Sequence, residues 1–204
     1  MIVTKIEPIT KTKFKIYIDE EFAFVLYKGE LSKNHIKEQE EIEEVLYDKI
    51  KKEIILKRGK LRAMHLLSQM DRSETQLRHK LKQNYYTEDI IDAVMDYVKS
   101  FGYINDREYA RRYIENKKQI KSKKEIGLLL FQKGIAKEQI DEAFQLYWEN
   151  ESEIEAIRVI LRKKNFNIEV ATDAEKQKLS GQLARKGFRY EDIRQVIQVS
   201  AWNA

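Results

Sequence analysis

The sequence predicts a mostly α-helical protein, in which three tandem three-helix repeats form an elongated array behind a small N-terminal β-meander. Three observations lead to this fold class. The 204 residues include one proline and seven glycines, so few positions interrupt regular structure. Apolar residues alternate with polar ones near the N-terminus and then change to helical spacing. The chain also repeats its own pattern from about residue 61 onward.

Residues 1–38 form the predicted β-rich region. Phe14, Ile16 and Ile18 alternate with polar neighbours at a period of two, which is typical of a half-buried strand. A turn at 19–21 is followed by a second apolar strand at 22–27, and an earlier strand is expected at 2–7, before Pro8. We therefore read residues 1–30 as strands. A meander of this size needs a helix to pack against.

Residues 39–60 form a predicted linking helix, and its helical pattern continues to about residue 69. Apolar residues recur at spacings of three and four, as in Ile42, Val45 and Leu46. Gly59 interrupts this run and is expected to mark a break or a bend.

The repeats are predicted at residues 61–105, 106–151 and 152–204. An offset of 49 aligns Ser73 with Ser122 and Leu81 with Leu130 without a gap, and a further offset of 53 aligns the third copy. A Lys-Gly pair recurs at 133–134 and 186–187, whereas the first copy has Asn-Tyr at 84–85. Because Asn tolerates the left-handed conformation that ends a helix, we expect the turn to survive there.

Helix caps support the repeat boundaries. Ser73 with Gln76, and Ser122 with Glu125, have the spacing of capping boxes, and Gly102 is placed to end a helix near residue 101. Asn105 is expected to cap the next helix. A three-helix unit of about 45 residues has little core of its own, so we expect neighbouring repeats to share apolar surface.

The positive charge is confined to the middle of the chain. Residues 57–124 contain 17 basic and 9 acidic residues, a net charge of +8, although the whole chain carries only +5. Such a segment favours an anionic partner, and the competing interpretation is a solvated lysine-rich face. The candidate contact residues, a hypothesis from charge alone, are Arg72, Arg78, Lys80, Lys82, Arg111, Arg112, Lys117, Lys118, Lys121, Lys123 and Lys124.

Tyrosines lie among these basic residues and could stack on nucleic-acid bases. For Tyr97, Tyr109 and Tyr113, whose spacing is helical, burial in the core is the favoured interpretation.

No catalytic constellation is recognisable. The sequence has no glycine-rich phosphate loop, no cysteine, and no metal-ligand spacing among its three histidines. We therefore expect a non-enzyme without cofactor or metal. No signal-peptide pattern and no apolar stretch of roughly 20 residues is present, which favours a cytoplasmic protein without membrane contact.

Several segments together resemble the RecX family of recombination regulators. The stretch 102–110, Gly-Tyr-Ile-Asn-Asp-Arg-Glu-Tyr-Ala, closely resembles the family signature. Residues 72–81, 130–143 and 186–196 resemble the corresponding parts of the three family repeats, in order and at the repeat spacing. The resemblance covers residues 61–202, and the first 30 residues are only loosely similar to the extra N-terminal region of longer members.

The resemblance implies a regulator of RecA recombinase, and we expect the protein to be a monomer. Family members bind RecA filaments on single-stranded DNA, lie along the filament groove, and limit filament extension, ATP hydrolysis and strand exchange. Double-stranded DNA is a further candidate partner. The family supplies no catalytic residues and no defined binding residues to carry over. It leaves open whether this member inhibits or stimulates its RecA and which face docks. The alternative function is a general DNA-binding helical module without a RecA role.

Overall fold

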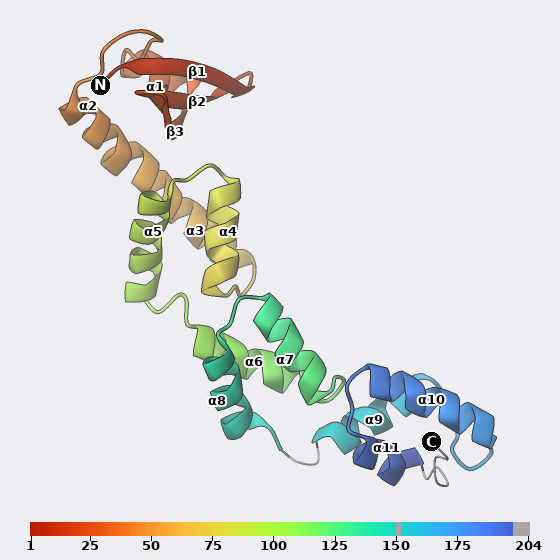
Figure 1. Cartoon of the computed structure of the whole chain (residues 1–204). Helices are drawn as coiled ribbons and strands as arrows, with labels where there is room; N and C mark the ends of the chain where they lie inside the picture. The colour runs from red at the N-terminus through yellow and green to blue at the C-terminus, as the bar shows by residue number, and fades with distance from the viewer. Residues whose placement is uncertain (150–151, 198–204) are drawn as a thin grey trace. The chain divides into compact units, whose positions relative to one another are not determined.

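The structure is a computed structural model that describes residues 1–149 and 152–197. It divides into two compact units, unit 1 (residues 1–105) and unit 2 (residues 106–204). The predicted fold class is confirmed, since the chain is mostly helical and has a small antiparallel sheet at the N-terminus (Figure 1).

The N-terminal sheet has the order β1-β2-β3, with β1 at Val3–Thr10, β2 at Lys13–Ile18 and β3 at Glu21–Tyr27. Both pairs of strands are antiparallel. The period-two pattern places Ile16 and Ile18 on the buried face. Asp19 and Glu20 have positive φ values of 48° and 72°, as a tight two-residue hairpin turn requires.

The expectation of strands over residues 1–30 fails at its end. Helix α1 (Lys28–Lys33) begins directly after β3. The Tyr27 main-chain N–H donates to the Glu30 carboxylate at 2.7 Å, so one of the amides that an α-helix leaves without a partner is satisfied. Glu30 therefore starts a helix where the apolar pattern alone continues a strand.

One continuous helical run follows the sheet. It consists of α2 (Glu44–Lys49), a π-helical segment η1 (Ile50–Leu56) and α3 (Lys57–Gln69). The break or bend expected at Gly59 is absent, because Gly59 lies inside the helical run and is buried. A Cβ atom there would lie 2.9 Å from Cγ2 of Val94, so the glycine allows α3 to approach α5 (Glu88–Ser100) closely.

The first repeat continues with α4 (Glu74–Gln83), and its capping box is formed. The Gln76 N–H donates to the Ser73 hydroxyl at 3.2 Å, and the Ser73 N–H donates to the Gln76 side chain. The predicted left-handed residue after α4 is wrong by one position. Asn84 has a φ of −94°, whereas Tyr85 has a φ of +64°. Gly102, after α5, has a φ of +69° as predicted.

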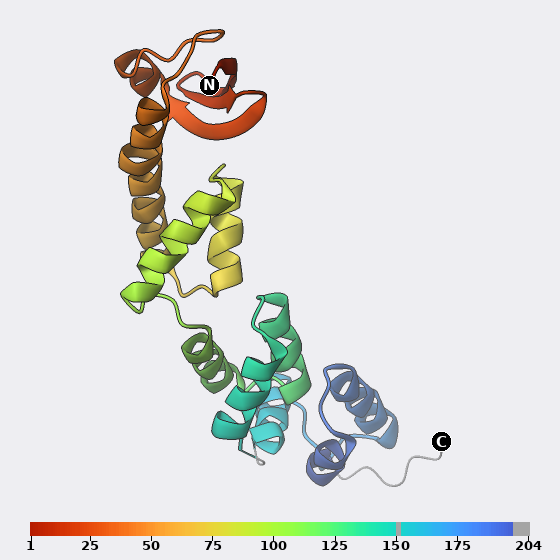
Figure 2. The same cartoon turned by 60° about the vertical axis from the view of Figure 1, so that its left-hand side comes forward.

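Unit 2 contains six helices among the residues described (Figure 2). They are α6 (Asp106–Lys117), α7 (Lys123–Gln132), α8 (Lys137–Tyr147), α9 (Ser152–Lys163), α10 (Asp173–Arg185) and α11 (Tyr190–Ile197). The predicted box at Ser122 is half formed. Its hydroxyl accepts from the Glu125 N–H at 3.0 Å, but the Glu125 carboxylate pairs with Lys121 instead of returning to the cap.

The different offsets of the repeats have a local cause. Helix α10 has 13 residues, and α7 has 10. The N-cap residues Ser122 and Thr172 are 50 positions apart, whereas Gly134 and Gly187, which follow the helix ends, are 53 apart. The third repeat therefore contains three additional residues within its second helix.

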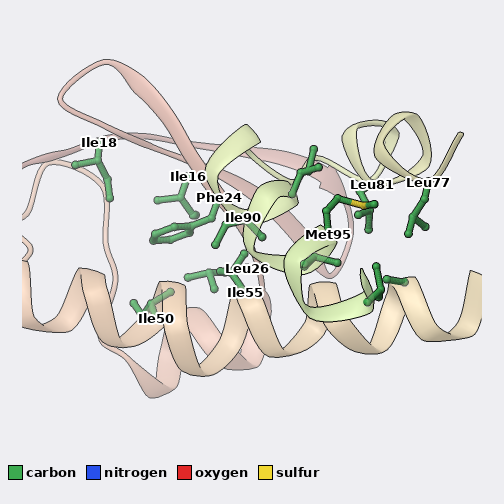
Figure 3. Close-up of a cluster of buried hydrophobic side chains, with 14 of the residues drawn as sticks. Ile16, Ile18, Phe24, Leu26, Ile50, Ile55, Leu77, Leu81, Ile90 and Met95 are labelled. Carbon is green, nitrogen blue, oxygen red and sulfur yellow. The ribbon is translucent and has the colours of Figure 1, made fainter. Parts of the chain in front are cut away.

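The buried apolar side chains form three clusters. In unit 1, the sheet, the long helical run and the first repeat share one cluster (Figure 3), which includes Ile16, Phe24, Leu26, Ile50, Ile55, Leu77, Leu81, Ile90 and Met95. In unit 2, residues 109–144 form one cluster and residues 156–197 form another. The expectation that repeats share apolar surface is therefore wrong for the second and third repeats. The buried apolar side chains of each of these two repeats pack against one another, within their own three helices.

Candidate functional site

The structure places the predicted contact residues in both units. Four of them, at positions 72–82, lie on or beside α4 in unit 1. The other seven, at positions 111–124, lie on α6, on the turn that follows it and on the first residues of α7 in unit 2. Each group is therefore a surface of its own unit.

Most of the charge in the unit 1 group is neutralised locally. Arg78 forms ion pairs with Glu74 at 3.0 Å and with Asp92 at 2.6 Å, and Lys82 pairs with Glu88 at 2.6 Å. Burial opposes ionisation of Glu74, but hydrogen bonds from Lys99 and Arg78 outweigh it and lower the Glu74 pKa.

The two remaining cations of this group bind uncharged oxygens. Arg72 Nε donates to the Leu66 carbonyl at 3.3 Å, and Lys80 Nζ donates to the Gln83 side chain at 3.1 Å. Unit 1 therefore offers little free positive charge along α4.

Four of the seven basic residues in unit 2 also have carboxylate partners. Arg111 pairs with Glu108 and with Glu115 at 2.8 Å, and Arg112 lies 3.7 Å from Glu108. The hydrogen bond to Glu108 raises the pKa of Arg111 and lowers that of the carboxyl, so both groups stay charged and cancel each other. Lys118 pairs with Glu149 at 2.9 Å, and Lys121 pairs with Glu125.

The other three of these seven predicted contact residues are lysines that have no carboxylate partner in the described part of the chain. We call Lys117, Lys123 and Lys124 the lysine triplet. Lys117 is the last residue of α6, and Lys123 and Lys124 are the first residues of α7. Cations at a helix N-terminus oppose the helix dipole, whereas α4 and α10 begin with Glu74 and Asp173. The start of α7 is therefore unusually positive.

Contacts from the third repeat support this helix start. The Lys123 N–H donates to the Glu153 carboxylate at 3.0 Å, and Arg189 Nε donates to the same carboxylate at 3.1 Å. The Ser122 hydroxyl donates to the Lys186 carbonyl at 2.6 Å. Burial raises the pKa of Glu153, and the nearby Asp192 carboxylate adds to the rise. A carboxylate is thus held in the interior beside the positive end of α7.

An apolar groove lies next to two members of the lysine triplet. It has a volume of about 760 Å³, and Lys123 and Lys124 border it. Its walls include Leu128, Phe131, Phe144 and Trp148. The side chains of Leu128 and Phe131 are 57% and 64% exposed. Large exposed apolar side chains that gather in a groove are typical of an interaction surface.

The sequence analysis missed this groove, although the signal was present. Residues 126–131 read Ile-Gly-Leu-Leu-Leu-Phe, so apolar residues surround this part of α7 on all sides. A ten-residue helix of a small repeat can bury only one stripe, so some of these side chains must face outward.

The three tyrosines at helical spacing pack into the cores. Tyr109 is buried, and Tyr97 and Tyr113 pack against the cores as partly buried residues, which confirms the core interpretation. Over residues 1–149 and 152–197, no group of three His, Asp or Glu side chains is arranged to hold a metal ion. No helix in the same ranges is long and apolar enough to cross a membrane.

Family models match the two outer repeats. Residues 60–97 match the first three-helix domain of RecX, and residues 151–197 match the third. Solved structures support the fold. The crystal structure of a regulatory protein RecX superposes with a TM-score of 0.61 at 23% identity, covering 98% of this chain and 99% of that one. RecX from Lactobacillus salivarius gives 0.57 at 25% identity, covering 70% and 94%.

Relatives of known sequence match over nearly the whole chain. The regulatory protein RecX of Caldanaerobacter subterraneus is 32% identical over 203 residues, which covers 98% of this chain and all of that protein. The regulatory protein RecX of Clostridioides difficile is 30% identical and covers 96% of this chain and 94% of its own length. On this full-length similarity, and with the repeat geometry described above, the chain belongs to the RecX family of regulatory proteins.

Proposed function

We propose that this chain is a non-enzymatic regulator of RecA recombinase. It binds RecA filaments on single-stranded DNA as a monomer and limits their extension, ATP hydrolysis and strand exchange. Family membership over the whole chain supports this function. The observation that carries it is the apolar groove of unit 2 bordered by Lys123 and Lys124.

The groove favours a protein partner over DNA alone. Nucleic-acid backbones present phosphates, and lysines without carboxylate partners suffice to bind them. Exposed Leu128 and Phe131 gain nothing from phosphates but bind apolar side chains of a protein, as buried anchors do at the centre of protein interfaces. A RecA filament on DNA offers both kinds of surface. In this proposal the lysine triplet contacts acidic or phosphate groups while the groove takes an apolar side chain.

The direct test measures ATP hydrolysis by RecA on single-stranded DNA with increasing amounts of this protein. The rate should fall at substoichiometric amounts, since one bound regulator affects the filament beyond its own contact. An unchanged rate at equimolar protein would contradict the proposed function. Binding to bare single-stranded DNA with an unchanged rate would support the alternative, a general DNA-binding module.

Two groups of variants separate the surfaces. Leu128→Ser with Phe131→Ser should weaken the effect on RecA but leave the salt dependence of binding to bare single-stranded DNA unchanged, because no charge is removed. Replacing the lysine triplet with glutamine should weaken both. Each phosphate contact contributes about 0.7 to the log–log salt slope on single strands, so the slope should flatten by up to about 2.

The matched control for the triplet is Lys118→Gln with Lys121→Gln. These two lysines already have carboxylate partners, Glu149 and Glu125, so their loss should change the slope less per residue. Equal slopes in the triplet variant and the wild type, with both proteins folded, would leave the triplet as a solvated face only.

A further inference from the structure

Unit 1 contains a second pocket, which the proposed function does not use. It has a volume of about 480 Å³ and lies between the sheet, α3 and the turn after α4. Lys13 and Tyr27 line it from the sheet, Arg58 and Arg62 from α3, and Tyr85 from the turn. None of the basic residues that were predicted to make contacts lies in it.

The cations of this pocket are incompletely compensated. Arg58 is satisfied, because it pairs with Glu30 and donates to the Val25 carbonyl at 3.1 Å. Lys13 and Arg62, by contrast, have no carboxylate partner within the described ranges, and the buried Nε of Arg62 has no hydrogen-bond acceptor. Burial lowers the pKa of Lys13, and the charges of Arg58 and Arg62 lower it further. The lining of the pocket therefore carries positive charge that no carboxylate of the described residues offsets.

The second observation is the strained residue at the pocket's edge. Tyr85 has a φ of +64°, whereas the equivalent positions of the other two repeats are Gly134 and Gly187. A bulky residue in this conformation costs about 1–2 kcal/mol. Tyr85 is 38% exposed, and the centre of its ring lies 5.6 Å from Lys13 Nζ and 5.0 Å from Lys15 Nζ. The backbone conformation thus places the ring of a partly exposed tyrosine beside two ammonium groups.

We propose that this pocket binds one nucleotide of single-stranded DNA, with its phosphodiester on Lys13 and Arg62 and its base stacked on Tyr85. A positive groove beside an accessible aromatic ring is the combination that binds single strands without sequence preference. A cavity of this volume is in the range that accepts a small ligand. This inference rests on the proposed function in one respect: it adds a contact in unit 1 with the same single-stranded DNA on which RecA assembles.

The first test is photocrosslinking of the full-length protein, without RecA, to an oligothymidylate that carries 5-iodouracil. We expect mass spectrometry to find the crosslink at Tyr85 or Tyr27. Crosslinks found only in residues 106–204 would overturn the proposal.

The variant test compares Lys13→Gln/Arg62→Gln with Lys11→Gln/Lys57→Gln. The control removes the same charge from the neighbouring turn and from α3, at exposed positions outside the pocket. The pocket variant should bind the labelled oligonucleotide about tenfold or more weakly, because two charge-assisted contacts are lost, and its salt slope should flatten by roughly 1.4. Equal weakening in both variants would overturn the proposal.

The variant Tyr85→Gly separates loss of DNA binding from loss of folding. This change relieves the backbone strain, so thermal stability should stay close to that of the wild type while the crosslink is lost and affinity falls. Retained affinity would contradict stacking on Tyr85.

Thymidine monophosphate at equal phosphate concentration should compete poorly with the single-stranded oligonucleotide for binding to the protein. Efficient competition would assign the pocket to free nucleotides instead. A RecA ATPase rate that the wild type leaves unchanged would refute the proposed function while leaving a Tyr85 crosslink standing.

Discussion

Unit 1 and unit 2 differ in the contacts that hold their substructures together. In unit 1, the sheet and the first repeat share one apolar cluster that runs from Val3 to Ile104. In unit 2, the second and third repeats keep separate clusters, and polar contacts connect them through Ser122, Glu153 and Lys186. A small helical repeat can therefore be joined to its neighbour either by a shared apolar core or by hydrogen bonds between two separate cores.

The difference has a functional consequence. The charged groups at the junction of unit 1 lie outside its shared apolar core, as in the partly exposed ion pair of Arg58 with Glu30, whereas the polar junction of unit 2 places a buried carboxylate at the start of α7. That carboxylate offsets the unfavourable position of Lys123 and Lys124 at a helix N-terminus. The polar junction thereby supports the charged surface to which we assign partner binding.

The largest expected effect compares Leu81→Ala with Leu130→Ala. The two leucines are equivalent in the repeats and fully buried, and each truncation should cost about 2–5 kcal/mol of local stability. Hydrogen exchange should show lost protection in the sheet as well as in α4 and α5 for Leu81→Ala, because they share a core. For Leu130→Ala the loss should concentrate in residues 106–147. Equal loss in α10 and α11 would show that the polar junction couples the repeats as tightly as a shared core.

A smaller effect is expected from Gly187→Ala. Gly187 has a φ of +87°, and an added Cβ would lie 2.9 Å from the Cβ of Lys124. The substitution should cost about 1–3 kcal/mol from backbone strain, and the clash adds to that. Gly102→Ala is the control, since its φ is +69° and its Cβ would meet nothing within 4 Å. Thermal unfolding of both variants should show the greater loss for Gly187, and equal losses would mean that the repeats do not pack closely at Lys124.

The smallest effect concerns pH and Glu153. Because burial raises its folded-state pKa, Glu153 favours folding when protonated, and this contribution is lost as pH rises through the folded-state value. Glu153→Gln lacks that loss, so its stability relative to the wild type should increase from pH 4 to pH 7. Denaturant unfolding across this range provides the measurement.

Glu155→Gln is the control on the same helix. Its hydrogen bond from Arg162 lowers the Glu155 pKa, so Glu155 contributes stability above its ordinary pKa and loses it as pH falls. Relative to the wild type, Glu155→Gln should therefore become less stable as pH rises, the opposite trend. Parallel trends in the two variants would contradict the raised pKa of Glu153 and would show that the hydrogen bonds from Lys123 and Arg189 outweigh burial.

The sequence predicted the fold well where local rules apply, and the candidate site less well. Alternation located β2 and an apolar run located β3, but β1 continues through Pro8 to Thr10, beyond the end expected before that proline. The Ser73 cap and Gly102 marked helix ends correctly. Gly59 was misread because a helical glycine can serve close packing as well as a break, and only its contact with Val94 distinguishes the two. Of the basic residues, sequence could give the charge and the pairs one helical turn apart, such as Arg111 with Glu115, but not those of Arg78 with Asp92 and Lys118 with Glu149, whose carboxylates lie on another helix or loop.

By itself, the sequence determined the helix and strand periods, the caps, the repeat offsets and the positive middle segment, because each depends on residues close together along the chain. Only the tertiary structure decided that Lys118 pairs with Glu149, that Leu128 and Phe131 form a groove, and that the second and third repeats bury separate cores. Ion pairs one helical turn apart, such as Lys121 with Glu125, are local, but burial and the longer-range pairs depend on side chains that meet only when the helices pack.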